Sequence, residues 1–376
     1  MSRRLKLNQG QSPGDILVFT AAVTDLAEQY PEYDIQVTSP CNAIFENNPF
    51  VNKTKDFEPE KLKYFPNALE ELGYDLYDIT RNYKEIFKGL IKKNKLGFRL
   101  NKDEKRWEYT YKDKIVFSTN NKAHGQKPRE FFDIKYSEYE PGISQSGHSG
   151  RHFSSAFYYD LEGRLGIKIN QTSLRPRLFL SEKEMSWTNQ VEQETGYRGK
   201  FWLINCGVKK DYPLKQWSLN YWQEMVNILK DKIQFVQVGA LEHDHIPLDN
   251  VIDMTGKTDM RQLIRLSFHA EGGVSHVSLL HHLMAAWEKP CVTIAGGREP
   301  RRWESYPNTR YLDTNGLLEC CSWDGCWQSG RLNDEGKNKT CKNTVGDRKP
   351  RCFEMIKPER VAEEVMNHYY GGRLKF

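Results

Sequence analysis

The chain opens with a change of hydrophobic period that predicts a strand, a loop and a helix. Apolar and polar residues alternate over Arg4–Asn8, whereas Ile16–Tyr30 places apolar residues at helical intervals. The segment between them, Gln9–Gly14, contains glycine and proline, which break regular structure. A second strand is predicted over Asp34–Ser39, after a turn marked by Pro31. A strand, a helix and a strand in this order form a βαβ unit, which implies a parallel sheet.

The same alternation returns in the second half of the chain. Phe201–Asn205 has the continuous apolar pattern of a buried strand. Further strands are predicted over residues 233–238 and 291–294, and helices over residues 218–229, 260–267 and 276–286. Between the halves, Tyr83–Glu182 has no clean period, and we interpret it as irregular with a few strands and helices. Two runs of alternating strands and helices predict an α/β protein with two doubly wound domains facing each other across a cleft.

Composition and charge exclude few functions. The 376 residues exceed the roughly 250–300 at which one hydrophobic core stops growing, which agrees with two domains. The sequence has no apolar run of the ~20 residues that span a bilayer and no signal-peptide core at its start, so we expect a cytoplasmic protein. The net charge of +5 neither requires nor excludes a nucleic-acid partner. The basic stretch Lys88–Arg106 fits either contact with an anionic acceptor or membrane surface, or an ordinary solvated face.

The loop before the first helix is the first candidate for chemistry. Its glycines, Gly10 and Gly14, would let a substrate approach the backbone at the N-terminus of the helix. The loop lacks the Gly-x-Gly-x-x-Gly pattern of dinucleotide-binding proteins, which weakens a dehydrogenase interpretation. Asp15 fits two roles at this position, a helix cap or a reactive carboxylate.

Several short motifs, in order along the chain, carry a family resemblance. They are Gly14-Asp15 at the helix start with Pro31–Val37 after it, the Lys-x-Trp-x-x-x-x-Trp pattern of Lys215–Trp222, Gly239–Glu242 at a strand end, and the Gly-x-x-His of Gly273–His276. Together they resemble glycosyltransferase family 9, the bacterial ADP-heptose heptosyltransferases. The resemblance covers about residues 4–50 and 200–312.

The resemblance implies a GT-B fold, which consists of two Rossmann-like domains. It implies an acceptor-side domain over residues 1–180, a nucleotide-sugar domain over 181–355 with a cysteine-rich loop over 318–353, and a terminal helix over 356–376 that crosses back to the first domain.

The resemblance also implies an inverting transfer of a heptose-like sugar, from a nucleotide-diphosphate donor linked to ADP, onto an acceptor hydroxyl of a glycan or protein. Asp15 occupies the position of the family's general base, which would take the proton of the acceptor hydroxyl. Lys215 matches the family's lysine and would stabilise the leaving diphosphate. Family members of this fold need no catalytic metal.

Further residues are expected to bind the donor. Where the family usually has Asp-Thr-Gly, this chain has Glu271-Gly272-Gly273, which leaves the identity of the donor open. We expect Gly272, Gly273 and His276 at a helix N-terminus beside the diphosphate. Arg298 fits either a phosphate contact or a surface cluster of arginines. The full expected donor-binding set is Gly14, Glu242, Glu271, Gly272, Gly273, His276 and Arg298.

Five of the eight cysteines gather near the C-terminus: Cys320, Cys321, Cys326, Cys341 and Cys352. A polar, cysteine-rich segment in a cytoplasmic protein more often binds metal than forms disulfides. The arrangement resembles the cysteine motif of the bacterial autotransporter heptosyltransferases, in which four cysteines hold iron. This resemblance implies a structural iron or zinc on Cys321, Cys326, Cys341 and Cys352, while free or disulfide-linked thiols stay open.

Other functions remain open at this point. A nucleotide-sugar epimerase or hydrolase would use the same fold without an external acceptor. A non-catalytic glycan- or nucleotide-binding protein is also compatible with the departure at Glu271. The acceptor itself stays open among a lipopolysaccharide core, a protein serine, another glycan and a modified nucleobase.

Overall fold

The computed structural model divides the chain into two compact units. The first comprises residues 1–52 and 133–376, and the second comprises residues 53–132. The structure describes residues 3–9, 11–51, 97–101, 106–111, 114–120, 134–135, 151–209, 213–322, 325–326, 341, 343–346 and 349–369. Most of the basic stretch Lys88–Arg106 lies outside the described residues.

The second unit contains a small antiparallel sheet with strand order β3-β4-β5. Its strands are β3 (Gly97–Asn101), β4 (Arg106–Tyr111) and β5 (Lys114–Asn120). They lie within Tyr83–Glu182, which we interpreted from the sequence as irregular with a few strands and helices.

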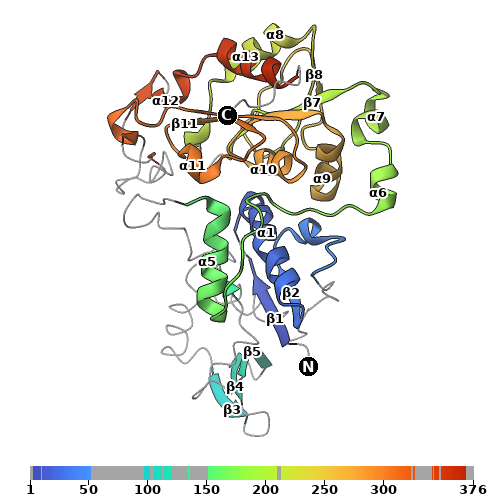
Figure 1. The fold of residues 1–376 in the computed structure, drawn as a ribbon, viewed down its shortest axis with the longest axis vertical. Coiled ribbons are helices and arrows are strands. Elements are labelled where there is room, and N and C mark those ends of the chain that lie inside the picture. Colours follow the sequence, from blue (N-terminus) through green and yellow to red (C-terminus); the bar gives the residue numbers. More distant parts are fainter. Residues whose placement is uncertain are drawn as a thin grey trace. The chain divides into compact units, whose positions relative to one another are not determined.

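The first unit begins with the predicted βαβ arrangement (Figure 1). Strand β1 (Arg3–Asn8) pairs in parallel with β2 (Tyr33–Thr38) and with the short β6 (Ile134–Lys135). Helix α1 (Pro13–Gln29) connects β1 to β2, with Ser12 as its N-cap and Pro13 in its first turn. Helix α1 packs against both α5 (Phe153–Leu165) and α10 (Leu279–Ala286), and its residues 16–27 are buried.

A second sheet, wholly parallel, lies in the same unit. Its strands are β7 (Phe201–Asn205), β8 (Gln234–Gln237), β9 (Val251–Asp253), β10 (Gly272–His276), β11 (Cys291–Gly296) and β12 (Thr309–Asp313). The strands follow one another in space as β9-β8-β7-β10-β11-β12. This is the doubly wound order, and its direction reverses between β7 and β10. The predicted α/β class is confirmed.

The remaining elements surround these sheets (Figure 1). The longer helices are α8 (Leu219–Leu229), α9 (Met260–His269) and α13 (Pro358–Tyr369). The shorter ones are α6 (Glu182–Ser186), α7 (Gln190–Thr195), α11 (Arg301–Glu304), α12 (Arg351–Glu354), η1 (Asn42–Phe45), η4 (Pro213–Lys215) and η5 (Glu319–Cys321). A hairpin of β13 (Thr344–Val345) and β14 (Lys349–Pro350) precedes α12.

One hydrophobic cluster connects the two sheets. It includes Leu5 and Phe19 from the first half and Leu203 and Leu283 from the second. The predicted boundary at residue 180 therefore separates two sheets within one compact unit. A further cluster, around Trp217 and Trp222, is covered by α13, which packs on α8 and β11. Among the described residues α13 thus extends the second half, and a crossing to the first half stays a prediction.

A buried ionic contact also connects the two halves. Arg261 of α9 donates to both carboxylate oxygens of Glu184 in α6, at 2.7 and 2.8 Å. The same guanidinium donates to the backbone carbonyl of Ala43 in η1, at 3.2 Å. The Arg261 contact lowers the pKa of Glu184 to about 2. Because this arginine bonds to both halves, it fixes the segment that links them.

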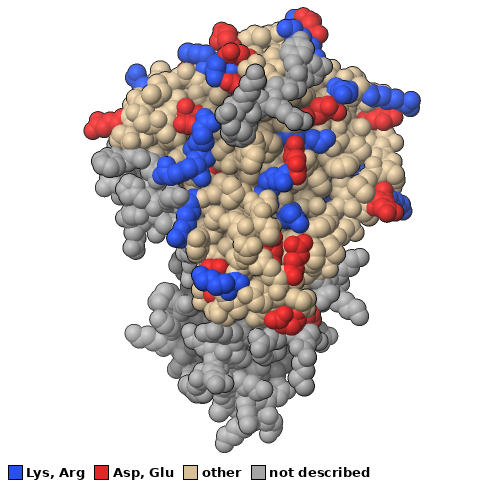
Figure 2. Space-filling view, viewed as in Figure 1, with Lys and Arg blue, Asp and Glu red and all other residues tan. Residues whose placement is uncertain are grey.

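The described surface is mixed in charge. On the face in Figure 2, lysine and arginine side chains alternate with aspartate and glutamate side chains. This agrees with the small net charge of the chain. No helix in the described ranges is long and apolar enough to cross a membrane.

Candidate active site

The carboxyl ends of β7, β10 and β11 bring three loops together at the point where the strand order reverses. Ligands of doubly wound sheets bind at this edge. Here β7 leads into η4 and Lys215, β10 leads to Ser278 at the N-terminus of α10, and β11 leads to Arg298 and Glu299. This edge is therefore the candidate active site.

Lys215 and Arg298, both predicted from the sequence, meet at one carboxylate. The Lys215 Nζ lies 2.7 Å from Glu299 Oε1 and donates to the Val277 carbonyl at 3.2 Å. The Arg298 guanidinium donates to the same Glu299 oxygen. Arg298 and Glu299 are both buried. Burial raises the pKa of Glu299, but the neighbouring Arg298 and Lys215 charges outweigh it and hold that pKa below its usual value.

The local fold fixes the backbone next to Lys215. The Trp217 side chain is fully buried, and its indole donates to the Ile356 carbonyl at 2.8 Å. The Trp217 amide donates to His276 Nε2 at 3.0 Å. Because Trp217 is held from two sides, the lysine two residues earlier starts from a fixed position.

Asp15 lies in the first turn of α1, as the sequence predicted. Its Oδ2 accepts hydrogen bonds from the Ser12 hydroxyl at 2.6 Å and from the Ser12 amide at 3.2 Å, which is the reciprocal part of a capping box. Burial raises the pKa of Asp15, while the Ser12 hydroxyl and the Lys215 charge oppose the rise. Asp15 therefore caps the helix and is also close enough to Lys215 to feel its charge.

Gly14 allows two helix N-termini to approach each other. A Cβ at Gly14 would lie 3.3 Å from the His282 ring and 3.8 Å from the Leu279 amide nitrogen, both in α10. The amides at the N-termini of α1 and α10 therefore lie near each other, with Lys215 close by. Such an edge favours an anion.

His282 lies at the start of α10 beside Gly14. Its Nδ1 lies 2.9 Å from the Tyr306 hydroxyl, and its Nε2 lies 3.9 Å from Glu304 Oε2. Burial keeps the pKa of His282 well below its usual value, so the ring is neutral. Ser278 is the N-cap of α10, so His282 in the first turn of this helix lies near the candidate edge.

His281, His282 and Glu304 bring three metal-ligating atoms within 4.8 Å of one another. However, both His281 nitrogens are engaged, Nδ1 with the Thr293 hydroxyl and Nε2 with the Glu304 carbonyl, each at 2.8 Å. A metal would have to displace one of these bonds, so His281 acts as a packing residue here. Burial and the Glu299 charge raise the pKa of Glu304 well above its usual value.

The structure corrects the placement of three predicted donor-binding residues. Glu271 is exposed at the amino end of β10, where Lys200 lies 3.5 Å away. Gly272 and Gly273 lie inside β10 and not at a helix N-terminus. A Cβ at Gly272 would lie 2.6 Å from the Trp202 ring, and one at Gly273 would lie 2.9 Å from the Met284 side chain. These glycines serve packing, at the opposite end of the strand from the candidate site.

His276 does lie at the carboxyl end of β10, but it does not begin a helix. Its ring packs edge-on against Trp222, with centroids 5.1 Å apart, and it is 1% exposed. Burial and the Lys215 charge lower the pKa of His276 to about 3. By accepting the hydrogen bond from the Trp217 amide, His276 helps to fix the loop that carries Lys215. Glu242, by contrast, is exposed in the loop that follows β8, on the same edge of the sheet as the candidate site.

Three of the four predicted cysteine ligands, Cys321, Cys326 and Cys352, border Gly297, directly after β11. A Cβ at Gly297 would lie 2.9 Å from Cys321 Sγ and 3.2 Å from Cys352 Cβ. The Cys326 amide donates to the Gly297 carbonyl at 2.9 Å. Burial raises the pKa of Cys352 to about 12, and the charges of Cys326, Cys341 and Cys321 contribute to the rise. The four cysteines therefore share one neighbourhood, although their thiols are not among the groups whose ligand atoms lie within 4.8 Å of one another in the described part of the chain.

Comparison with known proteins agrees with this geometry. The profile of glycosyltransferase family 9 (heptosyltransferase) matches residues 158–315. We call residues 158–315 the family 9 segment, after the profile that they match. The resemblance predicted from the sequence motifs is confirmed, and the match supports glycosyltransferase activity. Among the curated proteins, none matches the sequence.

Solved structures of glycosyltransferases share the fold of this chain at low sequence identity, and they confirm the predicted GT-B fold. The E. coli ADP-heptose lipopolysaccharide heptosyltransferase II is 18% identical, with 99% of each chain covered and a TM-score of 0.53. The E. coli iron-containing dodecameric glycosyltransferase TibC is 16% identical, with 99% of this chain and 77% of TibC covered and a TM-score of 0.54. TibC in complex with ADP-D-beta-D-heptose gives a TM-score of 0.55 at 14% identity, with the same coverage.

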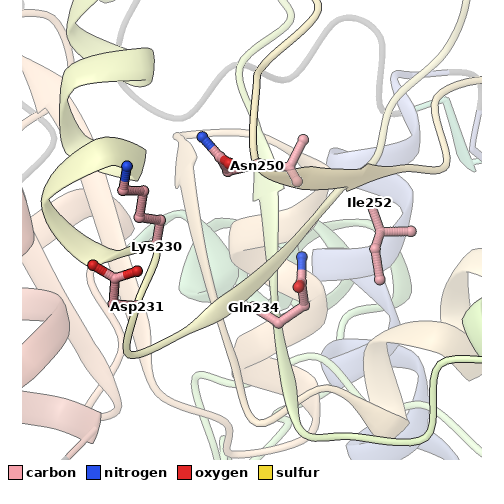
Figure 3. A pocket seen from close by; sticks show the side chains of 6 residues that line it. Lys230, Asp231, Gln234, Asn250 and Ile252 are labelled. Carbon is pink, nitrogen blue, oxygen red and sulfur yellow. The ribbon is translucent and has the colours of Figure 1, made fainter.

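The family 9 segment includes Lys215, His282 and Arg298, whereas Asp15 and the clustered cysteines lie outside it. Figure 3 shows a hollow lined by Lys230, Asp231, Gln234, Asn250 and Ile252. Gln234 is the first residue of β8, so the hollow lies at the amino ends of the strands. A donor site of a doubly wound family 9 segment belongs at the other edge, and the hollow is therefore not the candidate active site.

Proposed function

We propose that the chain transfers a heptose-like sugar from an ADP-linked nucleotide-diphosphate donor to an acceptor hydroxyl, with inversion at the sugar. The observation that carries the proposal is the meeting of Lys215 and Arg298 at the strand-order reversal of the family 9 segment. Relatives with this fold include one crystallised with ADP-D-beta-D-heptose.

The diphosphate is the part of the donor that these cations suit. Charged donors in a site with little water stabilise the negative charge that develops on a leaving group. The N-terminal amides of α1 and α10 add to this because helix N-termini favour anions. In this proposal Lys215 and Arg298 hold the diphosphate, and Glu242 contacts the nucleoside or sugar hydroxyls.

Asp15 is proposed as the general base. Its raised pKa brings it nearer to the range in which a carboxylate accepts a proton effectively. The proton of the acceptor hydroxyl would pass to Asp15 as the acceptor oxygen attacks the sugar carbon and the bond to the diphosphate breaks. The acceptor is a glycan or protein hydroxyl, and a contact of the basic stretch Lys88–Arg106 with an anionic acceptor or membrane surface is part of the same proposal.

The clustered cysteines are proposed to hold a structural iron or zinc. Cys321, Cys326, Cys341 and Cys352 would be the ligands, and the metal would link η5 to α12. Iron is favoured by the iron-containing relative, and zinc by the general preference of four-cysteine sites.

Isothermal titration with ADP-, UDP- and GDP-linked sugars tests which donor binds. An assay of nucleoside diphosphate release, with and without acceptors, then tests transfer. We expect the tightest binding for an ADP-linked sugar and a release of nucleoside diphosphate that depends on an acceptor. Rapid release without any acceptor would instead identify a hydrolase. Conversion of the sugar without release would identify an epimerase, and binding with no turnover across a broad acceptor screen would identify a binding protein.

A further inference from the structure

Glu299 is a buried carboxylate between the two cations of the candidate site, and no motif pointed to it. Its side chain is 4% exposed, and one of its oxygens takes both Lys215, at 2.7 Å, and Arg298. The other oxygen, Oε2, is buried without a hydrogen-bond partner in the described part of the chain. Oε2 can therefore accept a further hydrogen bond at this edge.

The backbone of Glu299 is itself held in place. Its carbonyl accepts hydrogen bonds from the Tyr311 hydroxyl and from the Asn315 side-chain amide, each at 3.2 Å. Gly325 packs against the Arg298 carbonyl, where a Cβ would lie 2.3 Å from the oxygen. A carboxylate on such a fixed backbone holds its partners in one place and does not follow an incoming ligand.

Glu299 places one negative charge between two positive ones, those of Lys215 and Arg298. Removing this negative charge would raise the local potential, and a diphosphate would experience the difference at short range. The carboxylate therefore opposes the binding of the same anion that the cations attract.

We propose that Glu299 is a positioning residue that sets the affinity of this edge for a nucleoside diphosphate. It holds Lys215 and Arg298 together when the edge is empty, and it limits their attraction for the diphosphate so that the product can leave. The inference rests on the proposed function, because it assumes that the ligand is a nucleoside diphosphate.

Glu299→Gln separates charge from placement. The substituted amide keeps the size and an oxygen for Lys215, but it lacks the charge. We expect ADP to bind the variant roughly tenfold more tightly in isothermal titration, with a steeper loss of affinity as salt is added. In steady state, the KM for the donor and kcat should both fall, because tighter product binding slows release. ADP affinity that is unchanged or weaker would overturn the inference.

A double variant covers the case in which Glu299→Gln folds poorly. Lys215→Ala alone removes one cation and leaves the Glu299 carboxylate paired with Arg298, so ADP binding should be largely lost. Adding Glu299→Gln returns the net charge to that of the wild type, and ADP affinity should recover by roughly tenfold over Lys215→Ala. No recovery would count against the inference, because a purely structural role for Glu299 predicts a further loss.

Glu364→Gln is the matched control. Glu364 is also a buried carboxylate with two arginine partners, Arg310 at 3.4 Å and Arg360, but it lies on α13. It should change thermal stability and leave ADP affinity unaltered. If the wild type binds no nucleoside diphosphate, the proposed function and this inference fall together. If the wild type binds ADP and Glu299→Gln does not alter the affinity, only the inference falls.

Discussion

Asp15→Asn tests whether the carboxylate is more than a helix cap. The substitution replaces a charged oxygen that accepts from the Ser12 hydroxyl at 2.6 Å with an amide that can still accept there. The cap should therefore survive in part, with a loss of about 1 kcal/mol or less. For a unit of this size that corresponds to a fall of roughly 2–4 °C in Tm. The protein should remain folded in the assay.

The catalytic role predicts a much larger effect on rate. Loss of a general base typically lowers the rate by ~10²–10⁴, which corresponds to roughly 3–5 kcal/mol in the barrier. Because the base acts on the acceptor, donor affinity should stay within a few-fold of the wild type. Thus the rate and the stability change by clearly different amounts only if Asp15 takes part in the reaction.

The assay measures nucleoside diphosphate release with the acceptor that gives the highest wild-type rate in a screen of glycans and proteins. Isothermal titration of the donor and thermal unfolding are measured on the same preparations. Ser12→Ala is the matched control, because it removes the capping hydroxyl and keeps the carboxylate. It should cost about 1 kcal/mol of stability. It should also raise the pKa of Asp15 further, since the Ser12 hydrogen bond lowers it, and so move the acidic fall in rate to higher pH. Substantial turnover by Asp15→Asn would reduce Asp15 to a cap.

Three other predictions follow from the described contacts. Lys215→Ala should weaken diphosphate affinity and slow turnover together, and unchanged values in titration and rate assays would remove Lys215 from the site. Cys352→Ser should release a bound iron or zinc, whereas the control Cys291→Ser should retain it. The metal content is measured by elemental analysis of protein prepared in reducing, chelator-free buffer. Wild-type protein without stoichiometric metal would refute the cysteine site. His276 stays neutral in the fold while the unfolded chain takes up a proton below about pH 6.5, so its contribution to stability is lost as the pH falls towards its pKa of about 3. His276→Asn should reduce that acid-dependent loss in urea unfolding, and an identical pH dependence in both proteins would contradict the assignment.

Local periodicity was sufficient to predict five strands of the two parallel sheets, β1, β2, β7, β8 and β11, but not β6, β9, β10 or β12. Phe201–Asn205 is a strand as predicted, because a continuous apolar run between polar loops fits a strand buried on both faces. For the antiparallel sheet of the second unit, the sequence predicted only a few strands without bounds, although β4 (Arg106–Tyr111) alternates aromatic and polar residues, because the surrounding lysine-rich sequence hid the period.

Strand β10 (Gly272–His276) shows where local reasoning failed. Its glycines suggested a loop before a helix, and the apolar spacing of Leu279–Met284 was extended backwards to His276. The glycines are needed because the Trp202 ring and Met284 occupy the space where a Cβ would lie, and that requirement comes from distant parts of the chain. The site likewise depends on distant parts of the chain, since Glu299 pairs with Lys215 only because the fold brings the loop after β11 next to η4.

A crystal structure of the protein with ADP would show where the diphosphate binds. We expect the diphosphate at the carboxyl ends of β7 and β10, in contact with Lys215 and Arg298 and facing the N-terminus of α10. ADP bound at the amino ends of the strands, for example in the hollow beside Gln234, or bound without either cation, would contradict this expectation.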